Sequence, residues 1–96
     1  MTFQIKPTQY FIEQVKALPK KQKQSIKKKI ELIKGNPFRF KRIHSKKFSK
    51  VFRVRLNLAG KETRLIYVLI EPNIILVCLL ERKNNYRDLE KYLSKR

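Results

Sequence analysis

The stretch VFRVRL, at residues 51–56, decides how this chain folds. Its strict alternation places Arg53 and Arg55 on one face of a strand and the apolar residues on the other. Two more apolar segments of strand length follow, at residues 63–70 and 74–80. Charged side chains within strands are costly unless they face solvent or a ligand, so the face with the two arginines is expected to hold something anionic.

Further cationic residues stand at the ends of the later two segments. Arg64 lies at the start of the second segment, and Arg82 lies just after the third. Tyr86 lies four residues after Arg82. Arginine offers a planar fork of donors that suits fixed contacts with phosphate. Four arginines on one small sheet therefore predict a binding surface for an anionic ligand.

Composition limits the possible partners. The chain has 96 residues, enough for one domain over residues 1–96, and its 42% of hydrophobic residues should form a single core. It carries 25 basic and 7 acidic residues, a formal charge of +18, with 15 of the basic residues in positions 1–50. Such a charge predicts a polyanionic partner: nucleic acid, a nucleoprotein surface or an acidic protein.

Several kinds of site are disfavoured by residue counts. The single histidine, His44, excludes a two-histidine ribonuclease within one chain, and it is interpreted as a loop residue that contacts RNA. The acidic residues show no paired spacing for a metal, and two glycines cannot build a phosphate loop. No metal and no cofactor are therefore expected. Cys78 is predicted to pack as a small hydrophobe.

No segment indicates a membrane. We find no secretory signal, and no apolar run approaches the ~18 residues that a membrane helix needs. The protein is expected to be cytoplasmic, with no membrane partner.

Residues 1–50 predict a strand followed by two helices. Phe3 and Ile5 alternate with polar neighbours up to Pro7, Thr8 can cap a helix over 9–18, and Pro19 separates it from a second helix over 20–34. The second helix carries a stripe of isoleucines at helical spacing and ends at a helix-stop signal. An irregular basic segment over 38–50 follows, with four expected core anchors: Phe38, Phe40, Ile43 and Phe48.

The second half predicts a three-stranded meander. Short turns at 57–62 and 71–73 imply antiparallel neighbours. A C-terminal helix with Tyr86, Leu89, Tyr92 and Leu93 on one side would cover part of the sheet. The predicted class is α+β: an N-terminal strand and a helical hairpin packed on an antiparallel sheet of about four strands, with a short C-terminal helix.

This order of elements resembles the RelE/ParE superfamily of small toxins over nearly the whole chain. The residues that carry the resemblance lie at 52–56 and 63–67, together with Arg82 and Tyr86. They are more similar to the RelE branch than to the ParE branch. The resemblance implies a type II toxin–antitoxin system: a ribosome-dependent, metal-independent endonuclease that cuts mRNA in the ribosomal A site and is neutralised by a cognate RelB-like antitoxin.

The implied reaction is attack of a 2′-hydroxyl on its neighbouring phosphate. It needs a proton acceptor, positive charge at the phosphate and a proton donor for the leaving oxygen. Arg64 and Arg82 are the candidates for the phosphate clamp, while Arg53 and Arg55 would hold that phosphate or the adjoining backbone. Tyr86 would stack on a base or transfer a proton. Taken singly, each arginine could also be a solvated or ion-paired surface residue, and Tyr86 a core tyrosine.

One departure from the RelE branch concerns the base. Lysines often stand in that branch where this chain has Arg53 and Arg55, and an arginine cannot lose its proton at neutral pH. A second pattern of the superfamily, a glutamate and a histidine before the final tyrosine, is absent because that position is Asn85. The candidates left open are Lys47, Lys50, Glu81, Tyr86 or a group on the ribosome.

The lysines predict a separate docking surface for ribosomal RNA. Its candidate residues are Lys20, Lys21, Lys27, Lys28, Lys46, Lys47 and Lys50. Two other functions stay open: a ParE-like toxin that poisons gyrase, and a basic RNA- or ribosome-binding protein without catalysis.

Overall fold

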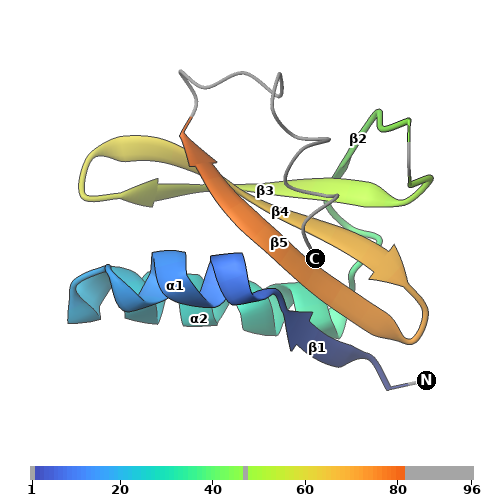
Figure 1. Ribbon diagram of the computed structural model, residues 1–96, viewed down its shortest axis with the longest axis horizontal. Helices are drawn as coiled ribbons and strands as arrows, with labels where there is room; N and C mark the ends of the chain where they lie inside the picture. The colour runs from blue at the N-terminus through green and yellow to red at the C-terminus, as the bar shows by residue number, and fades with distance from the viewer. Residues whose placement is uncertain (1, 47, 82–96) are drawn as a thin grey trace.

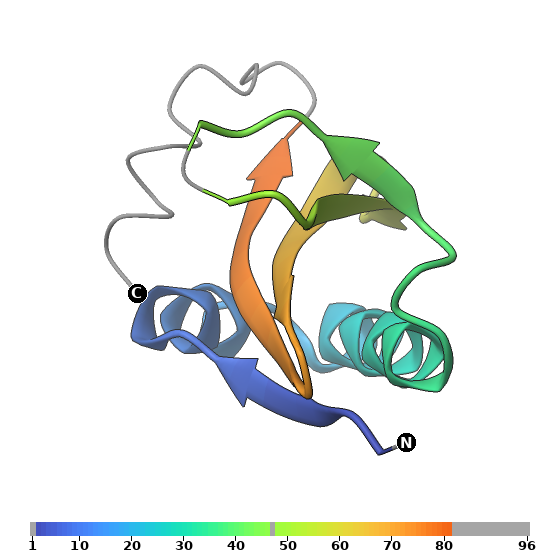
Figure 2. The same cartoon turned by 90° about the vertical axis from the view of Figure 1, so that its right-hand side faces the viewer.

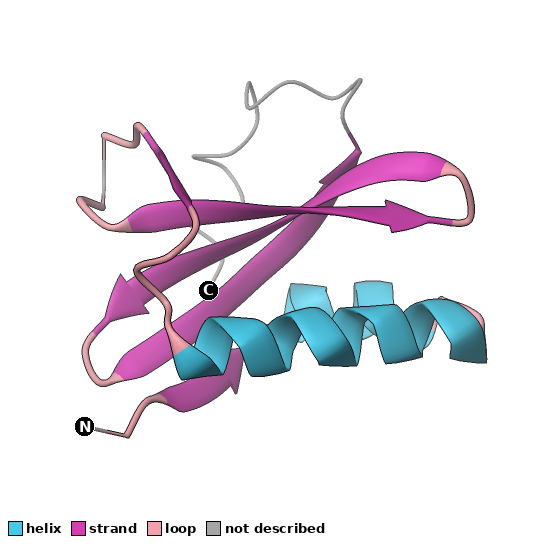
Figure 3. Ribbon diagram, turned by 180° about the vertical axis from the view of Figure 1, so that it is seen from behind, coloured by secondary structure: helices cyan, strands magenta, loops and turns pink. Residues whose placement is uncertain are grey.

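The computed structural model describes residues 2–46 and 48–81. These residues form a five-stranded sheet of order β1-β5-β4-β3-β2, with the two described helices on one face (Figures 1 and 3). The predicted α+β class is confirmed. The elements are β1 (Gln4–Pro7), α1 (Gln9–Lys16), α2 (Lys20–Gly35), β2 (Lys41–Ile43), β3 (Val51–Leu58), β4 (Lys61–Ile70) and β5 (Asn73–Glu81).

The predicted meander is confirmed, because β3, β4 and β5 pair antiparallel in sequence order. Ala59 and Gly60 form the tight β3–β4 turn with φ values of 53° and 83°. A two-residue turn with both φ values positive matches the right-handed twist of the flanking strands. The Asn57 side-chain oxygen accepts a 2.8 Å hydrogen bond from the Gly60 amide and fixes this turn.

Two features of the sheet differ from the prediction of about four antiparallel strands. The N-terminal β1 pairs parallel with β5, with Gln4 opposite Asn73, and β2 adds a strand inside the segment expected to be irregular. A pairing between residues about 70 positions apart leaves no local sequence signal. A three-residue strand is also too short to show alternation.

The helical hairpin forms as expected. The Thr8 hydroxyl accepts a 3.1 Å hydrogen bond from the Phe11 amide, which caps α1, and donates to the Val77 carbonyl at 2.9 Å. This one side chain therefore starts the helix and ties it to β5. On α2, Ile26 and Ile33 are fully buried and Ile30 partly so.

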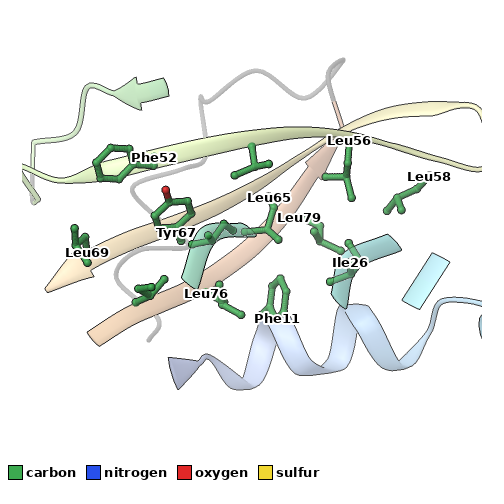
Figure 4. Packing of buried hydrophobic residues seen from close by; sticks show 13 residues of the cluster. Phe11, Ile26, Phe52, Leu56, Leu58, Leu65, Tyr67, Leu69, Leu76 and Leu79 are labelled. Carbon is green, nitrogen blue, oxygen red and sulfur yellow. The ribbon is translucent and has the colours of Figure 1, made fainter. Parts of the chain in front are cut away.

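The main core lies between the helices and the sheet (Figure 4). At its centre the rings of Phe52 and Tyr67 stack with centroids 5.2 Å apart. The Tyr67 hydroxyl donates to the Pro37 carbonyl, just beyond α2. This bond fixes the end of α2 against the sheet, and burial raises the pKa of the Tyr67 phenol above its ordinary value.

The prediction that Phe38 anchors in the core is wrong, because its side chain is 51% exposed. It makes an edge contact with Phe3, 6.1 Å between centroids, at the surface. The other three expected anchors of the 38–50 segment, Phe40, Ile43 and Phe48, are partly buried against core residues as predicted.

The sheet face turned away from the helices is also apolar over part of its area. Val51, Ile66, Val68 and Cys78 are buried there, with Ile43 and Phe48 among the side chains packed against them. The predicted C-terminal helix lies outside the described residues. None of the described helices has the length and apolar character needed to cross a membrane.

Candidate functional site

The alternation of β3 places its two arginines on the sheet face that the helices leave open. Val54 and Leu56 are buried in the core on the helix side, whereas Arg53 is half-buried and Arg55 exposed. The prediction for residues 51–56 is therefore confirmed. We call this side of the sheet, with Arg53, Arg55 and Arg64, the arginine face.

Arg55 on β3 lies directly opposite Arg64 on β4. Residues in direct cross-strand register share one face with their Cβ atoms about 5 Å apart, and like charges in such pairs are destabilising by roughly 0.2–1 kcal/mol. Arg64 is also only 9% exposed and its Nε is buried, so most of its side chain is covered by neighbouring residues. Two guanidinium groups in this arrangement favour an anion held between them.

Two residues of the arginine face were missed by sequence reasoning. Lys41 on β2 lies directly opposite Arg53, which extends the cationic surface to the edge strand. Glu62 on β4 lies opposite Asn57 and two residues before Arg64, so a carboxylate shares this face. The structure reveals both placements, because β4 begins at Lys61 and not at residue 63, and because Lys41 belongs to a strand in the segment expected to be irregular.

Glu81, one candidate for the general base, faces the other side of the sheet. It lies opposite Thr63 and its carboxylate is 3.8 Å from the Lys61 ammonium. Both residues line a cleft of about 520 Å³ beside the α1–α2 turn, and no arginine is among its described lining residues. Among the described residues, the arginines are therefore not part of this cleft.

Lys50, a second candidate base, is also placed away from the arginine face. Its ammonium is 3.2 Å from the Glu71 carboxylate and 5.7 Å from the Phe38 ring centroid. These contacts hold Lys50 at the β4–β5 turn. Neither of the two described candidates for the general base, Lys50 and Glu81, therefore lies beside the arginines.

Three predicted site residues, Lys47, Arg82 and Tyr86, lie outside the described residues. The described part of β5 ends at Glu81, whose partner Thr63 is the neighbour of Arg64. The described part of β5 therefore ends at the same end of the sheet as Arg55 and Arg64 (Figure 1).

The predicted docking lysines lie mainly on the opposite side of the molecule. Lys20, Lys21, Lys27 and Lys28 are exposed on α2, and Lys46 is exposed after β2. Helix α2 packs on the face of the sheet opposite the arginine face (Figures 2 and 3). Its exposed lysines and the arginines therefore lie on different sides of the sheet. His44 lies in the loop after β2, as predicted, and is exposed. Within the described residues, no cluster of histidine, cysteine or carboxylate side chains could hold a metal ion.

Comparison with known proteins gives a structural match without a sequence match. No family model and no curated protein sequence matches this chain. Free E. coli RelE toxin with two arginines replaced by alanine aligns at a TM-score of 0.69 and 14% identity, covering 99% of this chain and 94% of that one. Isolated RelE gives 0.64 and 15%, covering 97% and 99%.

The intact E. coli RelBE toxin–antitoxin complex also aligns, at a TM-score of 0.62 and 15% identity. The match covers 83% of this chain and 95% of that one. At these identities the likeness establishes the fold, so the chain has a RelE-like toxin fold. What such a fold does in this chain has to be argued from its own residues.

Proposed function

We propose that this protein is the toxin of a type II toxin–antitoxin system and cuts mRNA on the ribosome. The observation that carries the proposal is the direct opposition of Arg55 and Arg64, with Arg53 on the same open face. A surface with paired arginines suits the phosphate backbone of RNA, and the RelE-like fold supports the same reading.

The reaction is a transesterification within the message. The 2′-oxygen loses its proton and attacks the adjacent phosphorus, the bond from phosphorus to the 5′-oxygen breaks, and that oxygen takes up a proton. The products are a 2′,3′-cyclic phosphate and a 5′-hydroxyl, with no metal required. Arg55 and Arg64 stabilise the extra negative charge on the phosphate in the transition state.

The remaining catalytic roles are assigned to two residues after β5, to Glu62 on β4 and to the ribosome. Arg82 completes the phosphate clamp, and Tyr86 stacks on a base or donates the proton to the leaving oxygen. Glu62 is the proton acceptor that we propose from the described residues, because it stands on the arginine face two residues from Arg64. The ribosome supplies the positioning of the message.

The partners of this protein are the ribosome, with its mRNA and ribosomal RNA, and an antitoxin. The lysines of α2 give long-range attraction to ribosomal RNA. A RelB-like antitoxin in the cytoplasm neutralises the toxin. The alignment with the RelBE complex supports such a partner.

The proposal is tested with purified protein and ribosomes carrying a defined message. Cleavage is mapped by primer extension for the wild type, for Arg55→Ala and for Arg39→Ala, a matched control because Arg39 is exposed outside the sheet. We expect cuts in the A site that require the ribosome and Arg55 but do not require Arg39.

An intact message with folded protein would refute the nuclease. Drug-like gyrase cleavage complexes would then indicate a gyrase poison. Stoichiometric ribosome binding without toxicity would instead indicate a non-catalytic RNA-binding protein.

A further inference from the structure

We propose that Lys41 and Arg53 form a second phosphate position, which holds the nucleotide next to the one that is cut. The inference rests on the proposed function and deepens it. It adds a residue of the edge strand β2 to a site otherwise built on the central strands.

The orientation of Lys41 follows from the register of β2 on β3. Lys41 pairs with Arg53 and Ile43 pairs with Val51. Ile43 packs against the apolar cluster that contains Val51, on the side away from the helices. Since alternate residues of a strand share a face, Lys41 points to the arginine face with Ile43.

The residue between them points the other way. Arg42 pairs with Phe52, and its guanidinium carbon is 5.7 Å from the centroid of the Phe52 ring, which belongs to the core on the helix side. Strand β2 therefore sends one cation to each side of the sheet. Only Lys41 joins the arginine face.

The four cations fall into two pairs along β3. Arg53 pairs across to Lys41, and Arg55 pairs across to Arg64. Two residues of an extended strand span about 7 Å. That step is comparable to the separation of consecutive phosphates in an extended single strand.

The edge position of Lys41 suits a continuing strand of RNA. Lys41 is exposed, and β2 forms the sheet edge away from the two helices (Figure 2). A message whose scissile phosphate lies on Arg55 and Arg64 can place the adjacent phosphate on Lys41 and Arg53 and then leave over the edge. Each pair has one exposed member, Lys41 and Arg55, while Arg53 is half-buried and Arg64 is 9% exposed. Two cation pairs at this spacing favour a nucleic-acid backbone over an acidic protein segment.

The test combines a protein variant with a changed phosphate. Wild type, Lys41→Ala and Arg42→Ala are compared on ribosomes carrying a normal message and on messages with one uncharged methylphosphonate on either side of the cut. Lys41→Ala should lower kcat/KM about tenfold, as expected for loss of a charged hydrogen bond. Arg42→Ala, which removes the same charge from the neighbouring position, should stay within about twofold of wild type.

The changed message identifies the contact. A methylphosphonate at one neighbouring phosphate should slow the wild type by the same factor and slow Lys41→Ala no further. Additive losses, or equal losses in Lys41→Ala and Arg42→Ala, would overturn the inference while leaving the nuclease in place. A Lys41→Ala effect confined to antitoxin affinity would assign Lys41 to the antitoxin instead.

The proposed function can fail separately. If the wild type cuts no message, the same protein variants are compared by their Kd for a short single-stranded RNA, with and without the methylphosphonate. Non-additive losses in Kd would keep the phosphate position. Additive losses, or no RNA binding, would reject it.

Discussion

Arg55 shows the conflict between stability and binding at the scale of one residue. Its register places it opposite Arg64, where like charges oppose folding. A pair of this kind is expected at a site that is completed by an anionic ligand. Sites of this type are commonly less stable than their surroundings would allow.

We predict that Arg55→Gln keeps or raises the free energy of unfolding, and that any decrease stays within about 0.5 kcal/mol. Cleavage on programmed ribosomes should fall by about 10²-fold or more, as for loss of one transition-state donor. Urea unfolding and primer extension measure the two effects. A large loss of stability with unchanged cleavage would show that Arg55 is a structural residue.

Glu62 carries the second residue-scale prediction. Glu62→Gln keeps the shape of the side chain and removes its ability to accept a proton, so cleavage should fall by about 10²–10⁴-fold with ribosome binding unchanged. Glu31→Gln is the matched control, because Glu31 is an exposed carboxylate of α2 on the helix side. Full activity of Glu62→Gln would move the base to a residue beyond β5 or to the ribosome.

At the scale of elements, one buried hydrogen bond joins the end of α2 to the centre of the sheet. The Tyr67 hydroxyl is the donor and the Pro37 carbonyl the acceptor. We predict that Tyr67→Phe lowers the free energy of unfolding by about 1–2 kcal/mol, because the buried carbonyl loses its partner. Denaturant unfolding measures the loss. Cleavage should persist under folding conditions, since the bond lies on the helix side.

Strand β5 contributes a dependence of stability on pH. Burial raises the pKa of the Cys78 thiol to about 12. The unfolded thiol therefore ionises first, and the folded state binds more protons between the two pKa values. This contribution to stability is complete below the ordinary thiol pKa and is lost as pH rises toward about 12.

We predict that the free energy of unfolding of wild type falls more steeply above about pH 9 than that of Cys78→Ala, by about 1.4 kcal/mol per pH unit. Lysine deprotonation affects the free energy of unfolding of both proteins equally, so it cancels when their slopes against pH are compared. Urea unfolding across the alkaline range provides the measurement. Parallel slopes for the two proteins would mean that the thiol is not shielded from solvent in the folded state.

At the scale of the molecule, residues 2–46 and 48–81 form two basic surfaces that point in different directions. The α2 lysines lie on the helix side and the paired arginines on the other side of the sheet (Figure 3). A partner that contacts both has to enclose the protein. A ribosomal cavity with RNA on more than one side meets that requirement.

We predict that changing Lys20, Lys21, Lys27 and Lys28 together to Gln weakens ribosome association and lowers its salt dependence by about 3–4 units of log K per log salt. The single-turnover cleavage rate at saturating protein should stay near that of wild type, because none of these residues reaches the message. Association is measured at several salt concentrations. An unchanged salt dependence would place the ribosomal contact elsewhere.

The alternating and helical patterns of the sequence were sufficient to predict most of the described helices and strands. VFRVRL placed Arg53 and Arg55 on one face, and the isoleucine spacing of α2 identified the buried side of that helix, both as the structure has them. These predictions succeeded because each depends on a repeat within one element. Arg82, Tyr86 and Lys47 stay predictions of the sequence.

By itself the sequence determined the class of the fold, the meander and the charge that predicts an anionic partner. Only the tertiary structure decided that β1 pairs parallel with β5, that Arg64 lies opposite Arg55, and that Lys41 and Glu62 share their face. It also placed Glu81 and Lys50 away from the arginines. The physical reason is that register between strands is set by packing across the whole sheet, whereas periodicity reports only on the strand that carries it.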